Sequence, residues 1–208
     1  MKAISIINPK GGSGKSTLAI NLAGHLAQRS PAVLLGDIDR QQSCRRWLQS
    51  RPAGLASIET WRTDADDVLR PPKGITHAIL DTPAGLSGQA LENVVKVSSR
   101  IIVPVQASPF DLWATKLFLE HLAEIKAVSR GKAEVALVGM RVDPRTLAAT
   151  QLREFLARQG FQILTLIRPA QLYARVAAAG ATIFDVPPSL AVRERADWQP
   201  LLAWVDAK

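Results

Sequence analysis

The feature that most constrains this chain is a glycine-rich stretch between a short apolar run and a helical pattern near the N-terminus. Residues 10–17 read Lys-Gly-Gly-Ser-Gly-Lys-Ser-Thr. The preceding residues, Met1 to Asn8, are typical of a buried strand, and the apolar spacing from Leu18 to Ala27 is typical of a helix. Glycines at such a junction let backbone N–H groups approach an anion at the helix N-terminus. The sequence therefore predicts a phosphate-binding loop.

The residue types within the loop indicate separate roles in binding a nucleotide. We expect Lys15 to reach the β- and γ-phosphates and the Ser16 hydroxyl to hold Mg²⁺. Lys10 is a second lysine, which a single nucleotide site does not need. The alternative is a glycine-rich surface turn, but it does not explain why a strand pattern precedes the loop and a helix pattern follows it. The loop residues expected to contact the nucleotide are Gly11, Gly12, Ser13, Gly14, Lys15, Ser16 and Thr17.

Two later apolar runs end in aspartates. Residues 32–36 lead into Asp37 and Asp39, and residues 77–80 lead into Asp81. Carboxylates at i and i+2 lie on one face of an extended chain. The carboxyl ends of strands in an α/β sheet border the ligand crevice. We therefore expect all three carboxylates near the loop, with a strand-end cap as the alternative for the first pair.

Apolar runs alternate with helical patterns along the whole chain, which predicts an α/β fold. We expect a single domain over residues 1–208, built on a doubly wound, mostly parallel sheet flanked by helices. Residues 64–69 are expected to form a brief helix. A long helix should run to about Ser129, with Leu117, Leu119, Leu122 and Ile125 mostly inward. A last helix, about 190–205, carries Trp198, Leu201, Leu202 and Val205 at helical spacing.

Composition limits the classes of function. The net charge is +8, which favours a polyanionic partner such as nucleic acid, although a merely basic protein is the alternative. The one cysteine, Cys44, excludes an internal disulfide and fits a reducing cytosol. No run approaches the roughly 18 apolar residues of a spanning helix. The last helix has no basic residue between 198 and 205, so docking onto the core is favoured over lying on a membrane.

The stretch from Met1 to Thr17 resembles the ParA/MinD family of deviant Walker A ATPases, whose loop carries an extra signature lysine, and is especially similar to its small plasmid-partition members. The resemblance implies a P-loop NTPase fold in which Lys10 reaches the phosphates of a partner subunit. It implies that Asp39 positions the attacking water and that Asp37 supports the Mg²⁺ shell. The segment 77–85 resembles the family's Walker B pattern, which assigns Mg²⁺ to Asp81, through a water, and a switch role to Gly85.

Later segments resemble the family more loosely. Residues 109–113, Pro-Phe-Asp-Leu-Trp, resemble the start of a helix that relatives use in dimerisation. Residues 140–146 resemble the stretch near adenine, which implies base contacts from Met140 and Arg141, although Met140 stands where asparagine often reads the base. The family also places basic contacts around the last strand and helix, so Arg168 and Arg175 are the residues predicted to bind DNA.

The resemblance implies a Mg²⁺-dependent ATPase that forms a homodimer around ATP and positions DNA or another large cargo. It implies sequence-independent DNA binding, a ParB-like or other small cargo adaptor that stimulates weak hydrolysis, and a cytoplasmic, nucleoid-associated location without stable membrane association. With a strand starting at residue 2, no N-terminal DNA-reading domain is expected. The alternatives are a MinD-like membrane-associated regulator and a ParA-like ATPase that positions a non-DNA cargo. A metal-insertion ATPase is disfavoured because Cys44 has no second cysteine.

Overall fold

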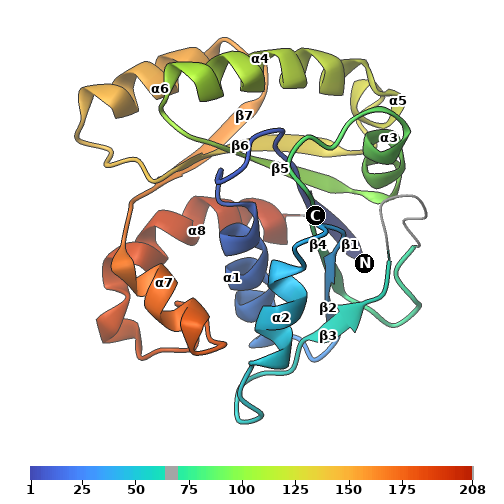
Figure 1. Cartoon of the computed structure of the whole chain (residues 1–208), viewed down its shortest axis with the longest axis vertical. Coiled ribbons are helices and arrows are strands. Elements are labelled where there is room, and N and C mark those ends of the chain that lie inside the picture. Colours follow the sequence, from blue (N-terminus) through green and yellow to red (C-terminus); the bar gives the residue numbers. More distant parts are fainter. Residues whose placement is uncertain (64–69, 208) are drawn as a thin grey trace.

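One parallel sheet forms the centre of the molecule. The computed structural model describes residues 1–63 and 70–207. Within these ranges seven strands lie in the order β3-β2-β4-β1-β5-β6-β7, and every pair is parallel (Figure 1). The strands are β1 Lys2–Ile6, β2 Val33–Asp37, β3 Glu59–Trp61, β4 His77–Asp81, β5 Arg100–Val105, β6 Glu134–Met140 and β7 Gln162–Ile167. The predicted doubly wound α/β fold is confirmed, and these strands are entirely parallel.

Helices cover both faces of the sheet (Figure 1). One face carries α1 Lys15–Ala27, α2 Ser43–Gln49, α7 Gln171–Ala178 and α8 Val192–Asp206. The other face carries α3 Gly88–Val97, α4 Pro109–Glu124, α5 Lys126–Ser129 and α6 Leu147–Ala157. A short 3₁₀ helix, η1 Pro188–Leu190, precedes α8. Because the chain turns back to β4 and then crosses to β5, the ends of β1, β4 and β5 border the crevice at which such sheets bind ligands.

The strand side chains divide between two apolar cores. In β4, Ile79 packs in the core beneath α1, whereas Ala78 and Leu80 pack in the core beneath α3 and α4. This follows from the alternation of side chains along a strand. Both faces are buried, so the strands read as continuous apolar runs rather than as alternating ones.

The C-terminal helix α8 docks onto the core, as predicted. Trp198, Leu201, Leu202 and Val205 are all buried. The Trp198 ring packs edge-on against Phe184, and its Nε1 donates to the Tyr173 hydroxyl at 2.9 Å. Across the described ranges, no helix is both long enough and apolar enough to cross a membrane.

The long helix predicted to reach Ser129 is two helices. At Ile125 the backbone is extended (φ −66°, ψ 127°), and α5 begins at the next residue. The inward prediction was correct for Leu119 and Leu122 and wrong for Leu117, which is 68% exposed. Leu117 lies seven residues after Phe110, on the outer side of the helix. The brief helix predicted at 64–69 lies outside the described residues.

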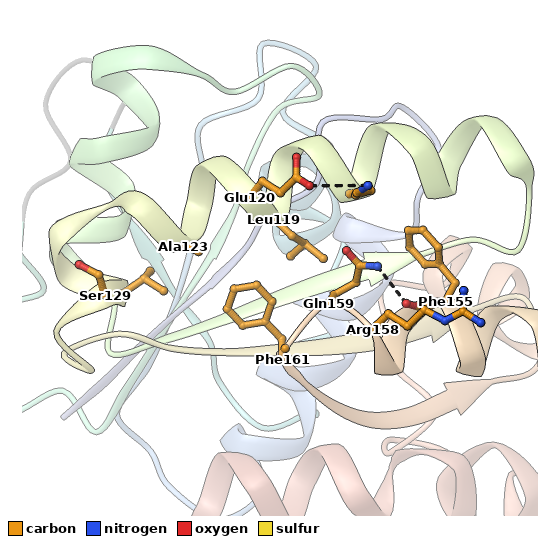
Figure 2. A pocket seen from close by; sticks show the side chains of 11 residues that line it. Leu119, Glu120, Ala123, Ser129, Phe155, Arg158, Gln159 and Phe161 are labelled. Carbon is orange, nitrogen blue, oxygen red and sulfur yellow. Dashed lines mark hydrogen bonds and ion pairs between the residues drawn. The ribbon is translucent and has the colours of Figure 1, made fainter.

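A groove runs between α4 and the end of α6 (Figure 2). It has a volume of about 660 Å³ and is lined by Leu119, Phe155 and Phe161 together with polar side chains such as Arg158. Gln159 closes the adjacent helix end by donating to the Phe155 carbonyl at 2.9 Å. None of the predicted site residues lines this groove.

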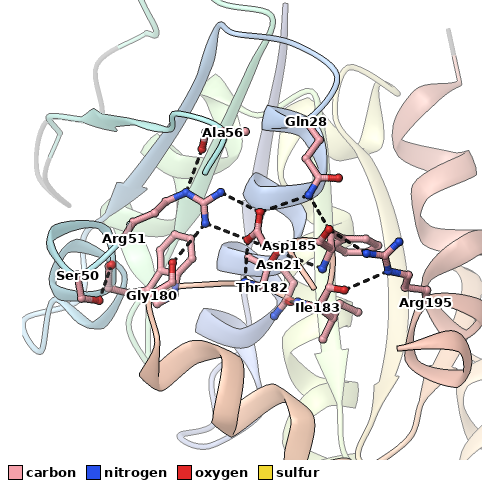
Figure 3. Close-up of polar contacts among 12 residues, drawn as sticks. Asn21, Gln28, Ser50, Arg51, Ala56, Gly180, Thr182, Ile183, Asp185 and Arg195 are labelled. Carbon is pink, nitrogen blue, oxygen red and sulfur yellow. Dashed lines mark hydrogen bonds and ion pairs between the residues drawn. The ribbon is translucent and has the colours of Figure 1, made fainter. Parts of the chain in front are cut away.

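A buried ion pair ties the chain after α2 to the loop after α7 (Figure 3). Arg51 donates to both oxygens of Asp185, at 3.0 and 3.2 Å, and the two side chains are 6% and 2% exposed. Asp185 also accepts the N–H and the hydroxyl of Thr182 at 2.8 and 2.7 Å. We call this group, Arg51, Thr182 and Asp185, the α2–α7 clamp. It holds one side of the molecule with fully partnered charges.

Candidate nucleotide site

The glycine-rich loop connects β1 to α1 in a conformation that requires glycine. Gly12 and Gly14 have φ angles of 72° and 98°. Gly14 directly precedes the first residue of α1, so the loop ends at a helix N-terminus. A Cβ atom on Gly14 would lie 2.8 Å from Cε of Met140, which packs behind the loop. Both the backbone conformation and the nearby Met140 side chain therefore favour glycine at this position.

Side chains from outside the glycine run hold the loop in place. The Asn8 carboxamide accepts from the Lys10 N–H and donates to the Pro104 carbonyl, both at 2.7 Å. Gln106 donates to the Gly12 carbonyl at 2.7 Å. Neither Asn8 nor Gln106 is among the residues predicted from the sequence. Their positions could have indicated them, since each follows the end of a buried strand.

Lys15 lies beneath the loop it belongs to. Its side-chain amine donates to the Asn8 and Lys10 carbonyls, at 3.2 and 2.9 Å, and only 8% of the residue is exposed. Burial lowers the pKa of Lys15, while the nearby Asp81 and Asp39 carboxylates oppose that shift. The amine is thus held at the centre of the loop, where a phosphate oxygen can replace a carbonyl as its partner.

Asp81 is a buried carboxylate with an unused oxygen. It lies at the end of β4, opposite Asp37 in the register of β2, and is 1% exposed. Its Oδ2 accepts the Cys44 thiol at 3.2 Å, and the Ser16 hydroxyl also bonds to the carboxyl. Its Oδ1 has no hydrogen-bond partner among the described residues. Burial raises the pKa of Asp81 to about 6, although the bonds from Ser16 and Cys44 lower it.

Asp37 caps the helix that follows it. Its Oδ2 accepts the N–H groups of Cys44 and Arg45 at 2.8 and 3.2 Å, and its Oδ1 accepts that of Asp39 at 3.0 Å. Burial raises the pKa of Asp37, and these backbone bonds oppose the rise. In this structure Asp37 therefore acts as a cap at the end of β2, which was the alternative expected from the sequence. Its support of a Mg²⁺ shell stays a prediction.

Asp39 is half-buried at the mouth of the site. Its Oδ1 accepts the Gln41 N–H at 2.9 Å, which fixes the turn into α2. The next turn residue, Gln42, has a φ of 51°. Asp39 is close enough to affect the pKa of Lys15. Loop, lysine and three carboxylates thus converge at one edge of the sheet, as expected.

The donor set fits a divalent cation. One ligand atom each from Asp37, Cys44 and Asp81 lie within 4.8 Å of one another, and Ser16 bonds to the last of them. A buried carboxylate oxygen without a donor is costly, and a bound cation would remove that cost. Mg²⁺ prefers oxygen ligands of this kind and keeps several waters. Burial raises the pKa of the Cys44 thiol well above its usual range, so the metal-free thiol is a donor.

The remaining predicted residues lie in different settings. Lys10 is half-exposed, and its amine pairs with no carboxylate in the described parts of the chain. Met140 is 3% exposed and packs under Gly14, whereas Arg141 is exposed with a φ of 57°. In this conformation a base could contact Arg141 more readily than Met140.

The two arginines predicted to contact DNA differ in their partners. Arg168 forms a two-pronged ion pair with Asp197, at 2.9 and 2.7 Å, and also donates to the Arg193 carbonyl. Arg175 is exposed on α7 and has no ion pair with any residue that the structure describes. Of these two arginines, Arg175 is the one whose charge is unpaired within the described structure.

Comparison with known proteins decides the family. The family described as CobQ/CobB/MinD/ParA nucleotide binding domain matches residues 4–183. The chain belongs to this family. The predicted ParA/MinD relationship is thereby confirmed, and the matched region contains the loop and all three strand-end aspartates.

Individual relatives cover nearly the whole chain. The maintenance of carboxysome distribution protein A of Gloeobacter kilaueensis is 30% identical over 99% of this chain and 94% of its own length. The chromosome-partitioning ATPase Soj of Thermus thermophilus is 30% identical over 91% of this chain and 90% of its own. The structure of apo McdA from Cyanothece superposes with a TM-score of 0.78 at 15% identity, over 97% and 99% of the two chains. At that identity, the structure supports the fold alone.

Proposed function

We propose that this protein is an ATPase that uses MgATP to position a large cargo, as one domain over residues 1–208. The observation that carries the proposal is the buried, unpartnered Oδ1 of Asp81 beside a phosphate-type loop. Lys15 and the loop N–H groups would hold the phosphates. Ser16 and Asp81 would hold Mg²⁺, whose charge stabilises the transferring phosphoryl group. Asp39, half-exposed at the mouth, would orient the attacking water.

The assignment is tested by separating ATP binding from turnover. Lys15→Ala should weaken ATP binding by roughly 100-fold or more, because charged hydrogen bonds to phosphate are lost. Asp39→Ala should bind ATP and hydrolyse it far more slowly. Asp206→Ala is the matched control, since Asp206 is exposed and pairs with Arg29, just beyond the end of α1 that lies farthest from the loop. An Asp39→Ala protein with wild-type turnover would remove Asp39 from the mechanism.

We propose further that ATP joins two copies of the chain and that Lys10 acts across the interface. Lys15 already occupies the loop, which leaves the amine of Lys10 available. Nucleotide charges enclosed between two subunits need partners, since buried unpaired anions are very costly. The exposed apolar side chains of Phe110, Trp113 and Leu117 on α4 supply a surface compatible with association.

Light scattering with and without ATP tests this arrangement. In the Asp39→Ala background, which holds the ATP state, Lys10→Ala should still bind ATP but remain monomeric. Lys73→Ala, at an exposed loop lysine, is the control and should dimerise. An ATP-dependent dimer that survives Lys10→Ala would refute the role in trans.

The relatives support two kinds of cargo. One is named for carboxysome distribution and the other for chromosome partitioning. We therefore keep both a DNA cargo and a non-DNA cargo as candidates. Either cargo would be attached through a small ParB-like or other adaptor protein that stimulates ATP hydrolysis. Affinity capture from cells of the source species with ATP-locked Asp39→Ala, against Lys15→Ala as the nucleotide-free control, should recover the adaptor. A lipid-bound regulator is less supported, because the apolar face of α8 is already buried.

We propose that the ATP-bound dimer holds to DNA without reading sequence, which would keep it in the cytoplasm at the nucleoid. Support comes from the net charge of +8 and from the unpaired, exposed Arg175. Arg168 should contribute less to DNA binding, because its charge is already paired with Asp197. A second surface is a groove of α3 and α5 lined by Lys96, Lys126, Arg130 and Lys132, with Glu92 and Glu124 beside them.

Anisotropy with duplex DNA at several salt concentrations distinguishes the two surfaces. Each lost phosphate contact should reduce the slope of log affinity against log salt by about 0.9. Two variants are compared: Arg175→Ala, and the triple variant Lys126→Ala, Arg130→Ala and Lys132→Ala. The variant that removes residues of the DNA-binding surface should have the smaller slope. Arg29→Ala is the control, because Arg29 is exposed and paired with Asp206. Binding without salt dependence, or equally strong with ADP, would refute DNA binding of this kind.

A further inference from the structure

Cys44 lies inside the predicted cation site rather than beside it. It is fully buried at the start of α2, and its Sγ lies 3.2 Å from Oδ2 of Asp81. Asp37, Cys44 and Asp81 each bring one ligand atom, and these three atoms lie within 4.8 Å of one another. The cluster comes from the ends of two neighbouring strands and the helix between them, so the fold itself brings the three residues together.

A second observation points to a cation at this cluster. The Oδ1 atom of Asp81 is buried and has no hydrogen-bond partner among the described residues. Asp37 accepts three backbone N–H groups, two on Oδ2 and one on Oδ1, which leaves a free lone pair on Oδ1 for a cation. The Asp81 carboxylate thus has one oxygen bonded to the Cys44 thiol and one buried oxygen without a donor, and a bound cation would supply the missing positive partner.

The thiol changes which cation this set prefers. A site of oxygens alone suits Mg²⁺, whereas sulfur favours softer ions of the Zn²⁺ class. Zn²⁺ binds thiolate sulfur at about 2.3 Å and carboxylate oxygen at about 2.0–2.2 Å, which puts tetrahedral ligand atoms roughly 3.5 Å apart. The Sγ–Oδ2 separation of 3.2 Å is already near that value. Asp37 would need to move closer by about 1 Å to complete the set.

We propose that Asp37, Cys44 and Asp81 bind a thiophilic divalent cation of the Zn²⁺ class in the nucleotide-free protein, and that this cation excludes MgATP. On binding, the S–H bond breaks, the thiol proton passes to solvent and the sulfur forms a bond to the cation. No electron is transferred. Exclusion follows because Asp81, bonded to Ser16, would be a ligand of either cation. The exclusion rests on the proposed function, whereas cation binding does not.

Cobalt absorption spectroscopy on the full nucleotide-free chain tests the site directly. Co²⁺ substitutes for Zn²⁺ and gives a near-ultraviolet charge-transfer band only when thiolate is a ligand. Since the chain has one cysteine, any such band reports on Cys44. The band should saturate at one equivalent and disappear when Zn²⁺ is added. Asp81→Asn should weaken Co²⁺ binding by roughly tenfold or more, and Asp206→Asn, an exposed aspartate paired with Arg29, should leave it unchanged.

Three outcomes would overturn the site. They are the absence of a charge-transfer band in folded wild-type protein, a band that is unaffected by Asp81→Asn and Asp37→Asn, and a band that persists in Cys44→Ala. Circular dichroism on each variant, with Cys44→Ser as a second cysteine variant, separates lost binding from lost folding.

A second measurement keeps this proposal apart from the proposed function. In chelator-washed protein, Zn²⁺ should raise the apparent Kd of MgATP by roughly tenfold or more in the wild type. It should not do so in Cys44→Ser, with each protein compared with its own zinc-free value. A cobalt band without any MgATP binding would contradict the proposed ATPase alone. MgATP binding that Zn²⁺ does not affect would contradict the exclusion.

Discussion

Two buried aspartates of this molecule have opposite surroundings. In the α2–α7 clamp, burial alone would raise the pKa of Asp185, but the bonds from Arg51 and Thr182 prevail and lower it. At the end of β4, burial prevails and raises the pKa of Asp81 to about 6. One carboxylate has a donor for each oxygen, and the other has an oxygen with no donor in the described structure.

The difference separates a structural group from a functional one. A buried charge with all its partners in place holds elements together and has no capacity left for a ligand. A buried charge with a missing partner costs stability, and proteins retain such groups where a ligand supplies the partner. On this comparison Asp185 is part of the scaffold and Asp81 is part of the site.

The largest expected effect comes from breaking the clamp. Arg51→Met leaves the Asp185 carboxylate buried without its cation, which should cost about 3–5 kcal/mol of unfolding free energy at neutral pH. Urea unfolding measures the change. Arg29→Met is the control, because the Arg29–Asp206 pair is exposed and should contribute less than about 1 kcal/mol. Equal losses in the two variants would contradict the distinction between a buried clamp and a surface pair.

The reverse effect is expected for Asp81→Asn in metal-free protein. The folded-state pKa of Asp81, about 6, lies above its ordinary value of 3.8, so the folded state binds the proton more tightly. That contribution to stability is complete below pH 3.8 and is lost as pH rises through about 6. Ionised Asp81 then costs up to roughly 3 kcal/mol, by the linkage of pKa to free energy.

Urea unfolding in chelator at pH 5 and pH 7.5 checks the sign. Asp81→Asn should gain stability relative to wild type as pH rises, and saturating Mg²⁺ should restore stability to wild type but not to the variant. A stability difference that is the same at both pH values would show that the carboxyl group of Asp81 is not strained by burial.

The smallest effect is expected at the loop itself. Gly14→Ala forces a side chain onto a φ of 98° and brings its Cβ to 2.8 Å from the flexible end of Met140. The conformational cost is about 1–2 kcal/mol, and the contact adds to it. Gly74→Ala has a similar φ, 92°, with no atom of the described structure within 4 Å of its Cβ, and should show the conformational cost alone. Met140→Ala should rescue part of Gly14→Ala and none of Gly74→Ala.

Much of this molecule could be predicted from its sequence, because the signals were local. The apolar runs predicted where the strands lie. The residues that form the phosphate-binding loop, Lys10 to Thr17, are consecutive in the sequence. The helix break at Ile125 and the outward direction of Leu117 could not be read, since both depend on which side of α4 meets the sheet.

Contacts between residues far apart in the chain could not be predicted from the sequence, for a related reason. Arg51 and Asp185 are separated by 134 positions, and neither lies in a recognisable motif. Arg168 was predicted to contact DNA because the family resemblance places basic contacts around the last strand and helix, yet Arg168 forms an ion pair with Asp197 on α8. From the sequence Cys44 is a lone cysteine, and its contact with Asp81 depends on the packing of α2 against β2, the strand next to β4 in the sheet.

The most direct test of the comparison is ATP affinity with and without Mg²⁺, measured by isothermal titration calorimetry on wild type, Asp81→Asn and Arg51→Met. If the unpartnered oxygen of Asp81 is the cation site, Mg²⁺ strengthens ATP binding by roughly tenfold or more in wild type. The same gain should appear in folded Arg51→Met, and Asp81→Asn should lose it while keeping Mg²⁺-free binding. An undiminished gain from Mg²⁺ in Asp81→Asn would contradict the account.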